Sequence, residues 1–200
     1  MRVILASKSP RRREILAMLG VDFEILSADA DESSDITNPA TLVTELSLRK
    51  GRAVRDLLQA KGAWDENTLI IASDTVVAAA GEILGKPADM KDAERMLRLL
   101  SGSTHEVVSG VAVLCGAREL ACAEHTGVRF AAMSDADLAW YLASDEPFDK
   151  AGAYAVQGLA SLFIQGLDGD YFNVVGLPVY RLNNLVKELL GRTLTELADK

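Results

Sequence analysis

The first candidate site joins a short apolar run to the start of a helix. Residues 2–7 read RVILAS, and the segment Ser7 to Arg13 adds a serine, a lysine and three arginines around Pro10. A proline at the first helical position and the N–H groups of the first turn make this junction suitable for a phosphate. The alternative is that the arginines only solvate the helix start, because neighbouring helical residues point about 100° apart.

A second candidate is Asp74, in the segment Ser73-Asp74-Thr75. It follows an apolar run at residues 69–72 that predicts a buried strand. A carboxylate at the C-terminal end of such a strand lies where α/β folds open their ligand crevice, and there it can hold a divalent cation or orient a water. An Asx turn at the end of the strand would explain the same residue without a function.

Two further segments could complete a site for a charged ligand. Lys86 lies between Gly85 and Pro87, so its ammonium is either directed at a phosphate or simply solvated. The acidic loop at residues 29–39 includes Glu32, and one of its carboxylates could complete a magnesium site with Asp74. Spacing alone leaves that step open. The Walker pattern G-x-x-x-x-G-K-[ST] is absent, so the sequence does not support a P-loop NTPase.

The order of apolar runs and helical periods predicts an α/β fold. Strands are expected at residues 2–7, 22–28, 68–73 with extended structure continuing through 76–80, two stretches within 104–130, and 161–167. Helices are expected at residues 10–20, 39–62, 89–101, 134–143 and 178–190. Because helices alternate with strands only in the first half, we predict a mixed twisted sheet flanked by helices. Two lobes should surround a cleft, within one domain over residues 1–200.

Composition limits the partners and the compartment. A formal net charge of −8 argues against broad binding to nucleic acid or to an anionic membrane. The chain has no apolar run long enough for a membrane span, and charges begin at Lys8, so we expect a cytoplasmic protein. Cys115 and Cys122 lack zinc or disulfide spacing and are expected to be reduced, while His105 and His125 are too few for a zinc site or a Ser/His relay.

Eight motifs in register across nearly the whole chain resemble the Maf family of nucleotide pyrophosphatases. They are S-x-S-P-R-R at residues 7–12, D-E-S at 31–33, Lys50 on the long helix, S-D-T at 73–75, G-K-P at 85–87, S-G-x-x-H at 101–105, G-A-Y-A-x-Q-G at 152–158 and N-V-x-G-L-P at 173–178. Each motif alone is modest, and the series in order is highly specific.

The resemblance implies a house-cleaning hydrolase that cuts nucleoside triphosphates between the α- and β-phosphates. It implies Mg²⁺ or Mn²⁺ as cofactor, a homodimer, and a fold similar to that of the inosine triphosphatases (Maf/Ham1). Asp74 would be the general base or water-orienting group, with Glu32 and Asp74 as metal ligands. The implied substrate-binding residues are Ser7, Ser9, Arg11, Arg12, Lys50 and Lys86. Such a site requires Ser9, Arg12 and Lys86 to converge beside Asp74.

The same resemblance indicates which base is preferred. Arg12, Thr75 and Gln157 match the subgroup that acts on dTTP and UTP. The subgroup that acts on 7-methyl-GTP has tryptophan directly after the proline, where this chain has Arg11, and it has glutamine after the aspartate and glutamate in the G-A-Y loop. Gln157 offers both a donor and an acceptor to a uracil or thymine edge. The alternative function is a nucleotide-binding regulator of septum formation, since the family has also been described in that role.

Overall fold

Parallel strands form the start of the sheet. The computed structural model describes residues 1–198. In it, β1 (Arg2–Leu5) pairs in parallel with β2 (Glu24–Ile25) and with β3 (Thr68–Ala79), and Leu5 lies opposite both Ile25 and Ile71. The strand order is β2-β1-β3-β5-β6-β7, with β5 (Thr104–Cys115), β6 (Arg118–Phe130) and β7 (Ile164–Gly169). β7 pairs antiparallel with β6, and β4 (Glu82–Leu84) pairs antiparallel with β3. The predicted mixed sheet is therefore confirmed.

The helices begin where the sequence predicts. They are α1 (Pro10–Met18), α2 (Pro39–Ala60), α3 (Met90–Leu100), α4 (Asp135–Leu142) and α6 (Val179–Leu190). Asn38 caps α2 by accepting a hydrogen bond from the Thr41 N–H, and Asp89 caps α3 in the same way. Ser134 and Asp137 form a capping box at the start of α4.

Several local predictions need correction. β2 has only two residues where seven were expected, and β7 begins at Ile164 because a 3₁₀ turn (Leu159–Phe163) occupies the start of the predicted strand. The short helix α5 (Tyr171–Val175) was not predicted. Further 3₁₀ turns lie at Glu146–Asp149, Ala151–Ala153 and Leu194–Glu196.

The chain forms two compact units. Unit 1 consists of residues 1–74, 109–124 and the described residues from Gly176 onward; unit 2 consists of residues 75–108 and 125–175. The chain passes from one to the other four times, between residues 74 and 75, 108 and 109, 124 and 125, and 175 and 176. Two of the motifs found in the sequence, S-D-T and N-V-x-G-L-P, therefore contain such a passage.

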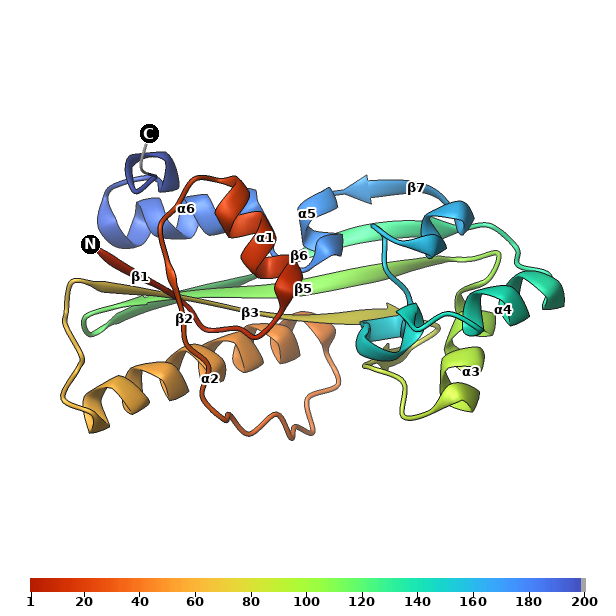
Figure 1. Cartoon of the computed structure of the whole chain (residues 1–200), viewed down its shortest axis with the longest axis horizontal. Helices are drawn as coiled ribbons and strands as arrows, with labels where there is room; N and C mark the ends of the chain where they lie inside the picture. Colours follow the sequence, from red (N-terminus) through yellow and green to blue (C-terminus); the bar gives the residue numbers. More distant parts are fainter. Residues whose placement is uncertain (199–200) are drawn as a thin grey trace. The chain divides into compact units, whose positions relative to one another are not determined.

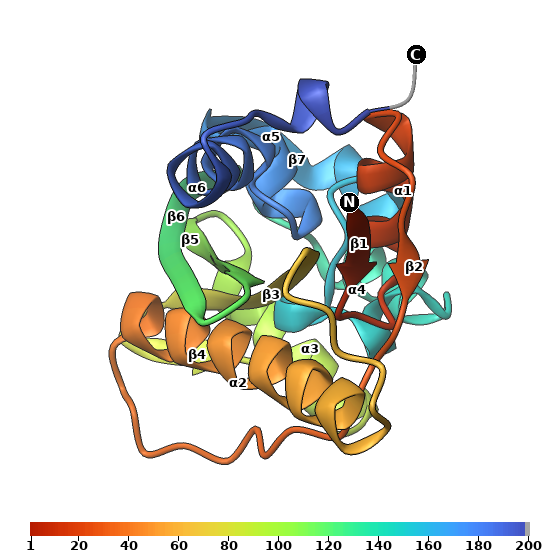
Figure 2. The same ribbon diagram turned by 90° about the vertical axis from the view of Figure 1, so that its left-hand side faces the viewer.

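Unit 1 is layered, with α2 on one face of its strands and with α1 and α6 on the other (Figures 1 and 2). Side chains alternate along a strand, so every second residue faces α2. Val54 and Leu58 of α2 share a buried cluster with Ile4, Ala6, Ile70, Ala72, Ala112 and Leu114. The backbones also approach closely: a Cβ on Gly110 would lie 2.1 Å from the Val43 carbonyl oxygen. α2 is thus pressed against β5.

Unit 2 has its own apolar core. α3 and α4 pack against each other and contribute Leu97, Leu100, Leu138 and Tyr141 to a cluster that also includes Phe130. The G-A-Y segment adds Ala153 and Tyr154 to this cluster. Within residues 1–198, no helix has the length and apolar character needed to cross a membrane.

Candidate phosphate and cation site

Unit 1 gathers two carboxylates around one lysine. Lys50 on α2 donates a hydrogen bond of 2.5 Å to Asp74 Oδ1, and its Nζ lies 3.2 Å from Glu32 Oε1. The side chain of Asp74 is 11% exposed and that of Glu32 is 61% exposed, so the pair joins a buried carboxylate to one that solvent reaches. The acidic loop therefore returns to β3, as the sequence analysis required for a site shared by these residues.

Asp74 lies within a strand, which corrects the expectation that it follows a strand end. β3 continues to Ala79, but its parallel pairing with β1 ends at Leu5 and Ile71. Ser7 and Ser73 lie two residues beyond that pair, so the polar residues begin close to where the parallel ladder stops. This is the position at which parallel sheets leave room for a ligand.

Arg12 is held in this region by a backbone carbonyl. Its Nε donates to the Gly176 carbonyl oxygen at 2.8 Å, and its Nη1 donates to Ser7 Oγ at 3.2 Å. Ser73 Oγ donates to the same carbonyl at 3.0 Å. Burial lowers the pKa of the Arg12 guanidinium, and the negative charges of Asp74 and Glu32 oppose that shift. The guanidinium remains a fixed positive charge at neutral pH.

The start of α1 supplies the other predicted groups of unit 1. Pro10 is the first helical residue, and Ser9 is the N-cap with an extended backbone. The Ser9 N–H donates to Ser7 Oγ at 3.2 Å, and the Ser9 hydroxyl does not cap the helix. The positive end of this helix, with Arg11 and Arg12 in its first turn, suits an anion.

The remaining predicted residues belong to unit 2. Thr75 is joined to Asp74 by the peptide bond at which the chain changes unit, and Lys86 and Gln157 are exposed. The Gly152 N–H donates to the Gly85 carbonyl at 3.0 Å, which brings the G-K-P turn against the G-A-Y segment. Gly152 has φ +69°, and a Cβ there would lie 2.9 Å from Val77 Cγ2, so this contact requires glycine. The convergence of Lys86 with the residues of unit 1 stays a prediction.

The donor set fits a small hard cation. Glu32 and Asp74 present carboxylate oxygens to one ammonium, which is itself a cation placed between them. Mg²⁺ is commonly held by one or two carboxylates, with water and substrate phosphates completing its shell. Across residues 1–198, no cluster of three or more His, Cys, Asp or Glu side chains could hold a metal.

Sequence reasoning missed three positioning groups. Arg49 contacts the backbone on both sides of Glu32, and the Gly176 carbonyl holds Arg12. In unit 2, the Glu146 carboxylate accepts hydrogen bonds from the N–H groups of Leu159 and Ala160, close to Gln157 in the chain. The available signal for Gly176 was its place in the N-V-x-G-L-P motif. Contacts to backbone atoms leave no mark on residue type, so the other two had none.

These features indicate a class of protein, and the comparison with known proteins then shows the family. An α/β protein that collects a buried carboxylate, fixed cations and a helix N-terminus where a parallel ladder ends has features typical of the class of phosphate-ester-binding proteins. The chain is matched by the Maf family model, "Maf-like protein", over residues 2–189, and it belongs to that family. The resemblance inferred from the sequence motifs is confirmed.

Curated relatives carry one printed name. A "dTTP/UTP pyrophosphatase" of Symbiobacterium thermophilum is 46% identical over 181 residues, covering 90% of each chain. Relatives with that name from Anaeromyxobacter and Bacillus cereus are 45% and 40% identical, covering 93% and 94% of this chain and 88% and 95% of theirs. Among solved structures, the Ham1 protein of Staphylococcus aureus matches with a TM-score of 0.47 and 13% identity, over 66% of this chain and 72% of that one.

Proposed function

We propose that this chain is a divalent-metal-dependent hydrolase that cleaves dTTP and UTP between the α- and β-phosphates, releasing the monophosphate and pyrophosphate. The observation that carries the proposal is the contact of Lys50 with both Asp74 and Glu32, beside the fixed guanidinium of Arg12. Relatives named dTTP/UTP pyrophosphatase, at 40–46% identity over at least 90% of the chain, support the reaction and the bases.

The cations and hydroxyls have a binding role in this proposal. Arg12 and Lys50 neutralise the polyphosphate oxygens, and Ser7, Ser9 and Arg11 add hydrogen bonds at the start of α1. Lys86 is assigned to the same polyphosphate. Phosphoryl substitution gains most of its rate from positioning and from neutralising charge, which rigidly held cations supply.

Asp74 is assigned the proton-handling role. Its carboxylate orients the attacking water and accepts its proton as the bond to the α-phosphorus forms and the bond to the bridging oxygen breaks. Pyrophosphate leaves with that oxygen. The buried setting of Asp74 and its hydrogen bond to Lys50 hold the carboxylate in one direction.

A divalent cation, Mg²⁺ or Mn²⁺, completes the proposed site. Asp74 and Glu32 would hold it, and it would supply charge neutralisation at the phosphate oxygens. The chain's residues contribute the two carboxylates and the loop that carries Glu32. Support comes from the fit of the donor set described above and from membership in the Maf family.

Base preference is assigned to Arg12, Thr75 and Gln157. The Gln157 amide can donate to a carbonyl and accept from an N–H of uracil or thymine, so both pyrimidines fit one set of contacts. The 5-methyl group distinguishes them only weakly, because one methyl group contributes little discrimination.

We also propose cytoplasmic action as a homodimer. The two cysteines are unpaired thiols, as expected in a reducing compartment. The Maf resemblance motivates the dimer, and unit 2 exposes Trp140 and the 71% exposed Leu162, which an interface would cover. Light scattering at micromolar concentration tests this proposal: the mass of a dimer would support it, and the mass of a monomer would contradict it.

The decisive experiment follows products from several substrates. The protein is incubated with dTTP, UTP, CTP, GTP or 7-methyl-GTP and with Mg²⁺ or Mn²⁺, and both pyrophosphate and orthophosphate are measured. Pyrophosphate with dTMP or UMP supports the proposal. Orthophosphate with a diphosphate would indicate γ-phosphate cleavage, and binding without products would favour the regulator of septum formation.

A further inference from the structure

The acidic loop that carries Glu32 has no regular structure of its own. It runs from the end of β2 to the start of α2 and forms neither helix nor strand. A local turn is closed by Asp31, whose Oδ1 accepts hydrogen bonds from the Ser33 N–H at 2.9 Å and from the Ser33 hydroxyl at 2.6 Å. This turn shapes the loop, but its atoms all belong to the loop, so it does not attach Glu32 to the rest of unit 1.

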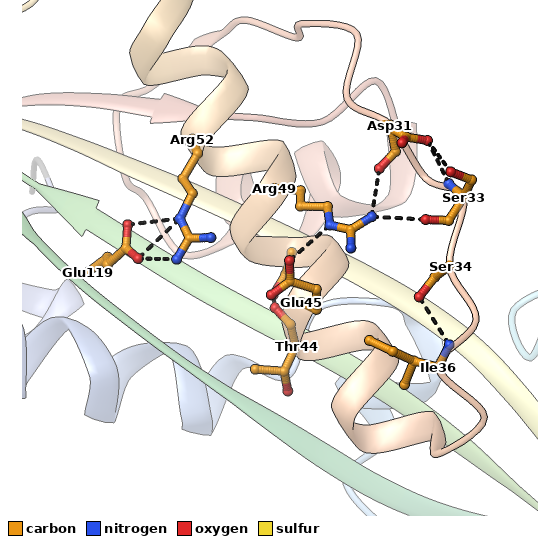
Figure 3. A network of polar contacts seen from close by, with 10 residues as sticks. Asp31, Ser33, Ser34, Ile36, Thr44, Glu45, Arg49, Arg52 and Glu119 are labelled. Carbon is orange, nitrogen blue, oxygen red and sulfur yellow. Dashed lines mark hydrogen bonds and ion pairs between the residues drawn. The ribbon is translucent and has the colours of Figure 1, made fainter.

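Arg49 makes that attachment from α2 (Figure 3). Its Nη1 donates to the Ser33 carbonyl oxygen at 2.9 Å and to the Asp31 carbonyl oxygen at 3.3 Å. The two carbonyls flank Glu32, so one guanidinium fixes the backbone on both sides of that residue. The Arg49 Nε donates to Glu45 Oε1 at 2.9 Å, one helical turn earlier, which fixes the direction of the guanidinium itself.

The neighbouring residue on the helix holds the side chain of the same glutamate. Lys50 Nζ lies 3.2 Å from Glu32 Oε1, while Arg49 holds the backbone of the loop. Glu32 is more than half exposed, so few other contacts hold its side chain. When the ammonium of Lys50 turns to a phosphate, the backbone anchor would keep the Glu32 carboxylate close to Asp74. Without the anchor, each binding event would have to order the loop, at a cost in conformational entropy.

We propose that Arg49 is a positioning residue: it fixes the acidic loop so that the Glu32 carboxylate is pre-arranged to bind the divalent cation. This inference deepens the proposed function and rests on it. Residues that orient a metal ligand typically change metal affinity or activity by about 10–100-fold when removed. The effect should therefore fall on the half-saturating metal concentration, with kcat at saturating metal close to the wild-type value.

The test compares two arginines of the same helix. Arg49→Gln removes the loop anchor, whereas Arg52→Gln removes an equivalent ion pair, to Glu119, that does not involve the loop (Figure 3). We expect Arg49→Gln to raise the half-saturating Mn²⁺ concentration by about tenfold or more. Hydrogen exchange at residues 29–36 should accelerate in the same variant. Both quantities should stay at wild-type values in Arg52→Gln.

Two further variants separate charge from geometry. Glu45→Gln removes the charge but keeps an oxygen that can accept from Arg49 Nε, so the guanidinium should keep its direction and the variant should remain near wild type. Arg49→Lys keeps the charge but lacks the planar fork, so it should restore the metal affinity only partly. Unchanged hydrogen exchange in Arg49→Gln would overturn the proposal, and so would a loosened loop with an unchanged Mn²⁺ requirement.

A readout without turnover keeps this test separate from the proposed function. Mn²⁺ binding followed by electron paramagnetic resonance, in the presence of dTMP, compares the same variants when no triphosphate is hydrolysed. Weaker Mn²⁺ binding by Arg49→Gln supports the positioning role even if the wild-type protein cuts no nucleotide, an outcome that would overturn only the proposed function.

Discussion

At the scale of single residues, Lys50 is expected to contact two different sets of groups. Its ammonium contacts Asp74 and Glu32 in the structure, and the proposed function also requires it to contact the polyphosphate. A cation between two carboxylates competes with a divalent metal for the same negative charge. Substrate binding would draw the ammonium toward the phosphates and leave both carboxylates for the metal. Metal and substrate are therefore expected to bind cooperatively.

This competition predicts that removing the charge of Lys50 strengthens metal binding and weakens activity. Lys50→Met should bind Mn²⁺ about tenfold more tightly than the wild type in the absence of substrate, because the competing charge is gone. The same variant should lose most of its activity, because the polyphosphate loses a cation. Calorimetry measures the first effect and pyrophosphate release the second.

Lys61→Met, an exposed position at the end of α2, is the matched control and should change neither quantity. Mn²⁺ binding to Lys50→Met that is as weak as in the wild type would show that Lys50 does not compete with the metal.

Sequence patterns predicted candidate site residues but not the groups that hold them. Asp74 and Arg12 stood out because charge beside an apolar strand or a helix start is conspicuous, whereas Lys50 became a candidate only through the Maf resemblance. Arg49 resembles any solvated helical arginine in the sequence, and its role comes from the carbonyls of Asp31 and Ser33. A long-range contact to a backbone oxygen depends on the fold, so no local pattern could predict it.

At the scale of elements, the position of α2 on the sheet determines whether Lys50 can reach Asp74 on β3. Gly110 on β5 lies under Val43, and Gly51, the residue after Lys50, lies against Leu114. These small residues let α2 approach the sheet closely enough for the Lys50 ammonium to reach β3. The position of α2 and the contact between Lys50 and Asp74 are therefore linked.

We predict that Gly110→Ala destabilises the protein by about 3 kcal/mol, because the new Cβ would meet the Val43 carbonyl and force α2 away. Hydrolysis should fall more than stability accounts for at temperatures where the variant is folded. Denaturant unfolding and pyrophosphate release measure the two effects. Gly127→Ala on β6, where a Cβ has only ordinary contacts, should be near neutral. Equal effects of the two variants would contradict this role for Gly110.

The buried residue His105 connects the strands of unit 2 to the G-A-Y segment by a hydrogen bond. His105 Nε2 forms a 2.8 Å hydrogen bond with the Tyr154 hydroxyl, and both rings contact Phe130. Burial lowers the pKa of His105 to about 4. Between pH 6.5 and about 4 the unfolded chain binds a proton at this residue that the folded protein does not, so stability falls as pH falls.

This shift predicts a pH dependence that one substitution removes. From His105 alone, the free energy of unfolding should decline by up to about 1.4 kcal/mol per pH unit below pH 6.5. His105→Gln retains a polar group for Tyr154 but does not titrate, so its stability curve should lack this decline. His125→Gln, at an exposed position, should retain it. Parallel curves for the wild type and His105→Gln would refute the assignment.

Element boundaries were predictable where capping chemistry is explicit. Pro10, Asn38 with Pro39, Asp89 and Ser134 start their helices, because their side chains or rings satisfy or replace the first N–H groups. β2 and α5 depend on pairing and packing with distant residues. Their lengths could not be predicted from local patterns alone.

At the scale of the whole molecule, the chain carries a net charge of −8 and is proposed to bind a polyanion. The contradiction is resolved locally, because Arg12, Lys50 and the positive end of α1 are concentrated near the end of the β1–β3 ladder. The mixed sheet followed from the order of strands and helices. Two lobes were predicted as well, but not the residues at which the two units divide, since β3 is one continuous strand across the passage at Asp74.

The most direct test of the central claim is pyrophosphate release from dTTP by Asp74→Asn, with Asp56→Asn on the exposed face of α2 as control. Thermal unfolding should confirm that both variants fold. We predict a loss in kcat of about 10²–10⁴-fold for Asp74→Asn and none for Asp56→Asn, since the proposed function gives Asp74 the proton of the attacking water. Turnover by Asp74→Asn at the wild-type rate would contradict it.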